Sequence, residues 1–159
     1  MAEKTNAARI LDRLKIPYEI LEYKVDLDHL EASHVAGELG QPIEQVYKTL
    51  ILRGDKTGIL VCVIPGDKEV DLKKTAKISG NKKVEMIHLK ELQPLTGYIR
   101  GGCTALGMKK TYPVYLYEKV LEYPFFYVSA GKRGAQLKLS PTDYIRATSA
   151  VISDIVSDI

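Results

Sequence analysis

The sequence predicts a single α+β domain in which short helices and strands form one mixed layer structure. Its length of 159 residues suits one domain with a sizeable core, and its composition, 45% hydrophobic and 27% charged, is close to the globular average. Short β-forming runs alternate with short amphipathic segments, which indicates mixed layers. Because no repeat, low-complexity tract or linker interrupts the chain, we expect one domain over residues 1–159.

Apolar spacing and capping residues predict the helices. Apolar side chains recur at helical spacing from Ala7 to Leu14, and Pro17 breaks the pattern. Asp71 offers an N-cap, and Pro141 suits the first position of a helix. The expected helical segments are residues 6–14, 33–39, 43–46, 71–78, 89–95 and 140–147.

Alternating and β-forming runs predict the strands. Polar and apolar residues alternate from Tyr18 to Tyr23, and the turn at residues 54–58 folds residues 47–52 back onto residues 59–64 as a hairpin. Residues 150–155 are expected to form a terminal strand or a helical end. The other expected strands are residues 83–86, 114–117, 125–128 and 136–139.

The net charge of +3 is unevenly distributed along the chain. Residues 1–67 carry 8 basic and 11 acidic side chains, residues 68–138 carry 14 and 6, and residues 139–159 carry 1 and 3. A cationic middle region attracts phosphates and holds RNA by its backbone. The alternative is a lysine-rich surface that only improves solubility.

Several classes of protein are not indicated. No apolar run approaches the roughly 18 residues of a membrane span, and the polar start lacks the core of a signal peptide, so we expect a cytoplasmic protein without a membrane partner. Cys62 and Cys103 form no CxxC pair, and the three histidines are scattered. With P-loop and dinucleotide fingerprints also absent, we expect no metal and no cofactor.

Two segments rich in glycine and positive charge stand out: the first glycine segment, residues 101–110, and the second glycine segment, residues 129–134. Glycine lets the backbone turn sharply and approach a ligand, and the adjoining cations favour an anionic one. Gly101 and Gly102 offer amides for a carbonyl or a developing oxyanion. Glycine pairs also form simple turns, so both interpretations stay open.

Three side chains are candidates for chemistry. Lys48 lies in a β-forming run, so we expect its ammonium beside the sheet, binding a phosphate or carbonyl; the alternative is an exposed lysine on a strand edge. Ser129 ends an aromatic strand, but no partner base is identifiable and no triad is predicted. Cys103 lies near Arg100, where we expect a packing residue in preference to a thiolate nucleophile.

Six short motifs follow one another along the chain. They are Val46-Tyr47-Lys48-Thr49-Leu50, Asp71-Leu72-Lys73-Lys74, Lys82-Lys83-Val84-Glu85-Met86, Gly97-Tyr98-Ile99-Arg100-Gly101-Gly102, Leu106-Gly107-Met108-Lys109-Lys110 and Ser129-Ala130-Gly131-Lys132-Arg133-Gly134. In this order they closely resemble the YbaK/EbsC family of free-standing aminoacyl-tRNA deacylases. The resemblance spans nearly the whole chain and is far more specific than one glycine loop.

The resemblance implies a fold and an activity. The fold is that of the editing insertion domain of bacterial prolyl-tRNA synthetase, with a central mixed, partly barrel-like β-sheet flanked by helices. The activity is removal of cysteine mischarged on proline tRNA, with Cys-tRNA(Cys) as a further substrate. The implied mechanism uses the cysteinyl thiol, which attacks its own ester and leaves as a thiolactone. Aminoacyl-tRNA is the implied partner, and docking on prolyl-tRNA synthetase is a further hypothesis.

The resemblance also implies roles for particular residues. Lys48 matches the signature lysine, which holds the 3′-terminal adenosine or the ester region, and Gly101 with Gly102 contacts the aminoacyl carbonyl through amides. The other implied residues are Tyr23, Ser129, Gly131, Lys132, Arg133 and Gln136 for substrate binding, and Lys73, Lys74, Lys109 and Lys110 for tRNA phosphates.

Two departures from the family pattern bear on specificity. Ala105 stands where many members have proline, which removes a fixed φ from the first glycine segment. Gln136 stands where some members have aspartate, and a carboxamide can hydrogen-bond but cannot act as a base. The rival interpretations are a hydrolase of Ala-tRNA(Pro) or another small aminoacyl-tRNA, and a binding module for tRNA ends or nucleotides without turnover.

Overall fold

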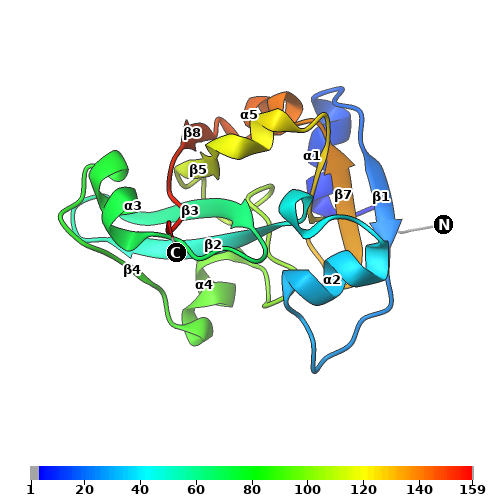
Figure 1. The fold of residues 1–159 in the computed structure, drawn as a ribbon, viewed down its shortest axis with the longest axis horizontal. Helices are drawn as coiled ribbons and strands as arrows, with labels where there is room; N and C mark the ends of the chain where they lie inside the picture. Colours follow the sequence, from blue (N-terminus) through cyan, green and yellow to red (C-terminus); the bar gives the residue numbers. More distant parts are fainter. Residues whose placement is uncertain (1–3, 159) are drawn as a thin grey trace.

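The computed structural model describes residues 4–158, whose strands form two sheets around a shared core (Figure 1). The large sheet has the order β4-β2-β3-β5-β8, and the small sheet has the order β1-β7-β6. Within residues 4–158 the strands are β1 (Glu19–Glu22), β2 (Tyr47–Gly54), β3 (Gly58–Pro65), β4 (Val84–Met86), β5 (Val114–Tyr117), β6 (Phe126–Ser129), β7 (Ala135–Leu139) and β8 (Val151–Ser153).

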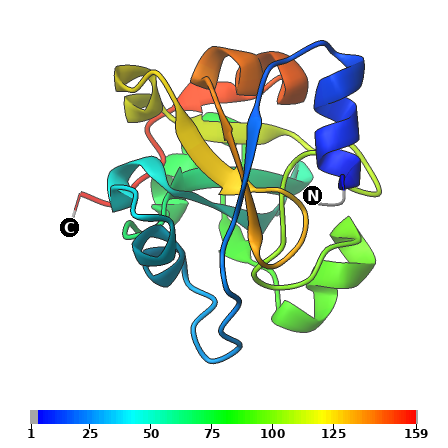
Figure 2. The ribbon, with the colours of Figure 1, turned by 90° about the vertical axis from the view of Figure 1, so that its right-hand side faces the viewer.

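Helices pack around the two sheets. In the described chain they are α1 (Asn6–Arg13), α2 (Ala32–Leu39), α3 (Leu72–Ser79), α4 (Leu92–Thr96) and α5 (Pro141–Thr148), with short 3-10 helices η1 (Ile43–Gln45), η2 (Leu89–Glu91) and η3 (Glu118–Glu122). Ala76 of α3 packs against the large sheet, while Ala36 of α2 packs against Tyr127 of the small sheet. Figure 2 places the small sheet toward the viewer, with α1 on one side and α2 on the other.

The β2–β3 hairpin is the centre of the large sheet. The two strands pair antiparallel along their whole length, as the sequence predicts. Ile51 and Val63 face the core shared with the small sheet, whereas Leu52 and Cys62 face the core under α3. Burial on both faces explains why β3 is an almost unbroken apolar run.

Local capping sets the helix starts. The side chains of Thr5, Asp71 and Ser140 each accept a hydrogen bond from a backbone amide in the first turn of α1, α3 and α5. The predicted segment 89–95 divides into η2 and α4, and residues 151–153 of the ambiguous C-terminal segment are strand β8. No helix within residues 4–158 has both the length and the hydropathy needed to cross a membrane.

The α+β class is confirmed, but the sheet does not close into a barrel. Among the described residues, β4 pairs with Leu52–Gly54 of β2, and β6 meets this side of the hairpin only at the isolated bridge between Val46 and Tyr127. Residues 47–50 therefore have a strand neighbour on the β3 side alone, and we call them the open edge of β2. The partial barrel expected from the family resemblance is in fact two linked sheets.

Candidate active site

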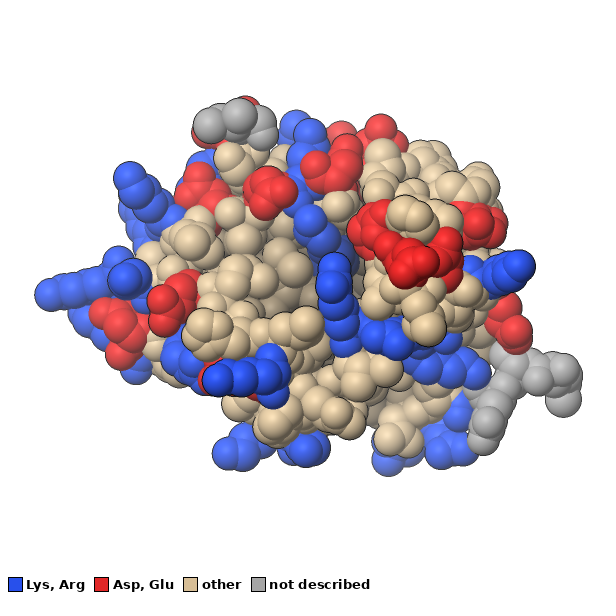
Figure 3. Space-filling view, turned by 90° about the horizontal axis from the view of Figure 1, so that it is seen from below, with Lys and Arg blue, Asp and Glu red and all other residues tan. Residues whose placement is uncertain are grey.

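A cleft of about 300 Å³ lies at the open edge of β2. Its walls come from four places: the open edge, the start of α2 with the loop before it, the first glycine segment, and the facing strands β6 and β7. Figure 3 shows Lys and Arg side chains across the middle and around the rim of this face, with Asp and Glu side chains in several separate groups, the most prominent of them at the right. The cleft thus combines a strand edge, a glycine turn and one wall of the small sheet.

Lys48 lines this cleft. It pairs with Ile64 in the hairpin and is half-buried, so its ammonium lies beside the sheet as the sequence predicts. Within residues 4–158 no hydrogen bond or ion pair engages this ammonium. An ammonium that borders a cleft without an acceptor is available to a bound anion or carbonyl.

The backbone of the open edge also faces the cleft. The amide of Ile87 donates to the carbonyl of Ile51 at 3.3 Å, which fixes the side of β2 on which the polar groups of Ile51 lie. Because backbone groups alternate in direction along a strand, the amide and carbonyl of Thr49 point the same way, toward the gap. Thr49 lines the cleft, so the strand edge adds a donor and an acceptor there.

Gly101 and Gly102 have different roles in the first glycine segment. Gly101 lines the cleft with φ +86°, and a β-carbon there would lie 3.3 Å from Leu30. Gly102 is buried, and its amide donates to the carbonyl of Ile99 at 3.0 Å. The Gly102 amide thus closes a turn, whereas the amide of Gly101 has no such partner in the described chain; contact of these amides with a substrate carbonyl stays a prediction.

The two glycine segments are in direct contact. A β-carbon on Gly102 would lie 3.1 Å from the main chain of Lys132 and Arg133, and the guanidinium Nε of Arg133 donates to the carbonyl of Arg100 at 2.8 Å. Gly131 packs against Tyr98, where its β-carbon would lie 3.3 Å from the ring. The segments thus form one joined wall, and Gly131, Lys132 and Arg133 support it from outside the cleft lining.

Ser129 and Gln136 face the cleft from the small sheet, where they are directly paired across β6 and β7. The Ser129 hydroxyl accepts a hydrogen bond from the amide of Gly131 at 3.2 Å. Gln136 is 6% exposed, and its Oε1 has no hydrogen-bond partner in the described residues. An unpaired buried acceptor costs about 1–3 kcal/mol, so a donor on a ligand would be well placed there.

The thiol that lines the cleft is protonated at neutral pH. Burial raises the pKa of Cys103 to about 12, and it does the same for Cys62 in the core. A thiol of this kind is a poor nucleophile, which fits the expectation of a packing residue at Cys103. Residues 4–158 contain no group of three or more His, Cys, Asp or Glu side chains arranged to hold a metal ion.

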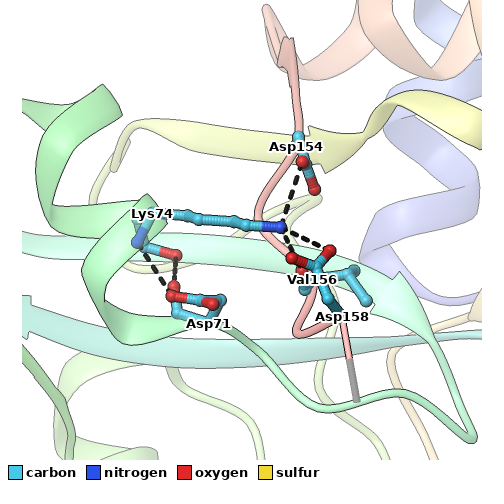
Figure 4. Close-up of polar contacts among 6 residues, drawn as sticks. Asp71, Lys74, Asp154, Val156 and Asp158 are labelled. Atoms are coloured by element: carbon cyan, nitrogen blue, oxygen red, sulfur yellow. Dashed lines mark hydrogen bonds and ion pairs between the residues drawn. The ribbon is translucent and has the colours of Figure 1, made fainter.

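Other predicted site residues lie elsewhere. Tyr23 is absent from the cleft lining, and its amide donates to the carbonyl of Gly134 at 3.0 Å. Lys73, Lys109 and Lys110 are exposed on the surface. The ammonium of Lys74 is already engaged by Asp154, Asp158 and the Val156 carbonyl at the C-terminal end (Figure 4), so its expected role as a tRNA contact does not fit this geometry.

Sequence reasoning missed the wall that α2 provides. Leu30, Ala32 and Val35 line the cleft, yet they carry no motif and are far from Lys48 in sequence. One signal was available at Gly66, directly after β3, where a β-carbon would lie 2.3 Å from that of Ala32. A glycine at the end of a buried strand indicates such a close approach.

Comparison with known proteins fixes the family. The sequence profile of the aminoacyl-tRNA editing domain matches residues 29–147, which include the cleft residues from both sheets. The chain belongs to the aminoacyl-tRNA editing domain family. A protein of Enterococcus faecalis named as a candidate Cys-tRNA(Pro)/Cys-tRNA(Cys) deacylase, EbsC, is 50% identical over 155 residues, covering 98% of this chain and 94% of its own.

Solved structures of similar fold agree with this editing-domain membership. A candidate trans-editing enzyme for prolyl-tRNA synthetase has a TM-score of 0.81 at 23% identity, covering 98% of this chain and 99% of its own. The hypothetical protein APE2540 has a TM-score of 0.88 at 24% identity, covering 96% of this chain and 100% of its own. At these identities the likeness concerns the fold, and the predicted relation to editing domains is confirmed.

Proposed function

We propose that this editing domain is a free-standing deacylase that clears Cys-tRNA(Pro), with Cys-tRNA(Cys) as a further substrate. The observation that carries the proposal is the 50% identity, over 98% of the chain, to a relative named for this reaction. The cleft supports it because Lys48, Gly101 and Gln136 line it together, and in the described chain the Lys48 ammonium and the Gln136 Oε1 have no partner.

In the proposed reaction the substrate attacks itself. The sulfur of the cysteinyl side chain forms a bond to the ester carbonyl carbon, and the bond from that carbon to the ribose oxygen breaks. The thiol proton ends on the ribose hydroxyl, so the products are a cyclic thiolactone and free tRNA, with no added oxidant or cofactor. The protein needs only to hold the thiol against the carbonyl, which is catalysis by proximity and orientation.

Three groups of the cleft take distinct roles in this reaction. The amide of Gly101 stabilises the oxyanion that develops on the ester carbonyl. Lys48 holds the 3′-terminal adenosine or the ester region by its charge, and the Gln136 Oε1 accepts a hydrogen bond from the substrate ammonium. Gly102 supports the wall by packing, and Ser129 positions Gly131 through its accepted hydrogen bond.

A thiol or hydroxyl nucleophile of the protein fits the cleft less well. The raised pKa of Cys103, about 12, keeps that thiol protonated at neutral pH. The Ser129 hydroxyl is within hydrogen-bonding reach of an amide donor, and in the described chain no histidine or carboxylate bonds to it. An activated serine needs an adjacent base, so attack by the substrate thiol is the simpler route.

Exposed lysines around the cleft supply the proposed tRNA contact. Lys109, Lys110 and Lys132 lie on or beside the glycine segments, and Lys73 lies farther away on α3. Contacts to phosphates give affinity that falls with salt and carry no base readout. Selection of tRNA(Pro) would then come from docking on prolyl-tRNA synthetase, which we include as part of the proposal.

A panel of charged tRNA(Pro) tests this function. Release of amino acid is measured from tRNA(Pro) charged with Cys, S-methyl-Cys, Ser and Ala, and a thiolactone is sought by mass spectrometry. The thiol route predicts rapid release of Cys alone, with the S-methyl ester stable. Release of Ala as fast as that of Cys would contradict the thiol route and indicate hydrolysis by water. Binding of charged tRNA without release of any amino acid would indicate a non-catalytic binding module.

A further inference from the structure

A second cleft, of about 430 Å³, lies at the same end of the hairpin as the first, beside the paired residues Tyr47 and Pro65. It opens beside the ends of the parallel strands β3 and β5, where its lining includes their last residues, Pro65 and Tyr117, and it also includes Val156, which follows β8. Ligands of open sheets with parallel strands bind outside the carboxyl ends of the strands. Tyr47 is the residue that the linings of the two clefts have in common among the described residues.

Tyr47 lines this second cleft and carries a buried, unpaired hydroxyl. The side chain is 3% exposed, and its ring packs edge-on against Phe126 with centroids 5.3 Å apart. Its hydroxyl has no hydrogen-bond partner in residues 4–158. Burial raises the pKa of Tyr47, and Tyr123, Tyr117 and Glu122 add to the rise, so the phenol stays protonated and lies near these lining residues.

The remaining lining combines aromatic surface with charges of both signs. Tyr117 and Tyr123 are half-buried, and Lys68 and Lys119 are exposed at the rim. The carboxylates are Glu44, Glu122 and Asp158, of which Asp158 is paired with Lys74 at 2.9 Å. A ligand that suits this lining has a planar ring, hydroxyl or amino donors, and an anionic end.

We propose that the second cleft binds a free nucleoside monophosphate whose base carries an amino group. The base lies against the tyrosine rings, and its edge meets the Tyr47 hydroxyl. Glu122 accepts hydrogen bonds from the amino group or the ribose hydroxyls, while Lys68 and Lys119 contact the phosphate. The volume of about 430 Å³ lies within the usual range of small-molecule sites.

Calorimetric titration of the full chain with AMP tests this proposal, with adenosine and inorganic phosphate titrated separately. We expect AMP to bind about tenfold more tightly than either part, because ring and phosphate contacts act together. Tyr47→Phe should weaken AMP binding about fivefold, which corresponds to the loss of one neutral hydrogen bond. Lys119→Ala should weaken it and reduce its salt dependence.

Tyr144→Phe is the matched control. The Tyr144 hydroxyl is also buried and unpaired within the described chain, but Tyr144 lines neither cleft, so AMP affinity should not change. Lys48→Ala, which should lower deacylation about 100-fold, should leave AMP binding intact; this separates failure of the second site from failure of the proposed function.

Three outcomes would overturn the proposal. The first is the absence of binding at millimolar AMP. The second is equal affinity for phosphate alone, which would mean that only an anion binds at the lysines. The third is loss of AMP binding in Lys48→Ala, which would place the nucleotide in the first cleft. If Tyr47→Phe perturbs folding by circular dichroism, Lys119→Ala carries the test instead.

Discussion

Lys48 and Lys74 are both half-buried lysines, but their ammonium groups have opposite surroundings. The ammonium of Lys74 bonds to Asp158 at 2.9 Å, to Asp154 at 3.1 Å and to the Val156 carbonyl at 3.0 Å, and its pKa is raised to about 12, first through the bond to Asp158 (Figure 4). In the described chain the ammonium of Lys48 has no partner, although it borders a cleft. The contrast teaches that a lysine in a sequence motif becomes a candidate for ligand binding only when no acceptor of the protein already engages its ammonium.

The largest expected effect is at the unpaired lysine. Lys48→Ala should lower single-turnover release of cysteine from Cys-tRNA(Pro) about 100-fold, the loss typical of one electrostatic contact to a reacting group. Its free energy of unfolding should change by less than about 0.5 kcal/mol, because no bond within the protein is lost. Lys90→Ala, at an exposed lysine of η2, is the control and should keep full activity. Full deacylation activity in Lys48→Ala would contradict a binding role for the unpaired ammonium of Lys48.

The next effect concerns the wall beside Lys48. Gly102→Ala places a methyl group 3.1 Å from the main chain of Lys132 and Arg133, and we expect a loss of about 1–3 kcal/mol in the free energy of unfolding. Activity should fall as well, since the glycine segments would separate. Gly37→Ala is the control: nothing lies within 4 Å of that position in α2, and stability should rise by about 0.5–1 kcal/mol. Urea unfolding measures both, and equal stabilities would contradict the close packing.

A smaller, local effect is expected at the paired lysine. Lys74→Ala removes the cation that ties residues 154–158 to α3. The amides of Asp71 and Ser157, which bond to the carbonyls of Ile155 and Glu69, should then exchange hydrogen faster, while those of β3 keep their protection. Release of cysteine should stay within about twofold of wild type, because distant sites act independently. A loss of activity as large as that of Lys48→Ala would mean that Lys74 also takes part in substrate binding, in addition to its ion pairs.

The smallest effect appears only in acid. Glu91 pairs with Arg53 at 2.8 Å and accepts from the amide of His88, and these contacts, led by Arg53, lower the pKa of Glu91 from 4.5 to about 2. Because the folded pKa is the lower one, the stabilisation is complete above pH 4.5 and is lost as the pH falls toward 2. Glu91→Gln should remove this part of the pH dependence, as thermal melts between pH 2 and 6 would measure. An unchanged profile would mean that the pair adds nothing to stability.

Much of the fold could be predicted because local chemistry decides it. The hairpin follows from two β-forming runs around a turn, and Asp71 and Ser140 cap their helices in the structure as their sequence context indicates. The second sheet could not be predicted in the same way. Strand β4 pairs with one end of β2, and β6 meets the chain only just before the other end. This arrangement depends on long-range packing, which a short sequence motif does not predict.

The candidate site was predictable where a residue type is unusual for its place. Lys48 was notable as a lysine in an apolar strand, and Gly101 as part of a glycine pair. Both line the cleft, together with Ser129 and Gln136. The use of the Gly102 amide in a turn was not predictable, because the partner is a backbone carbonyl. Ala105 is half-buried against the core and does not line the cleft, so its departure from the family pattern acts on the loop and not on the pocket directly.

The open edge of β2 has a consequence for solubility. Unpaired strand edges invite pairing with other chains, which is a route to aggregation. Here the edge is recessed behind the start of α2 and the glycine segments, and it bears a lysine. A ligand can reach the backbone of Thr49 inside the cleft, while the walls hinder a full strand from another molecule. The same recess that forms the site thus protects the protein from edge-to-edge association.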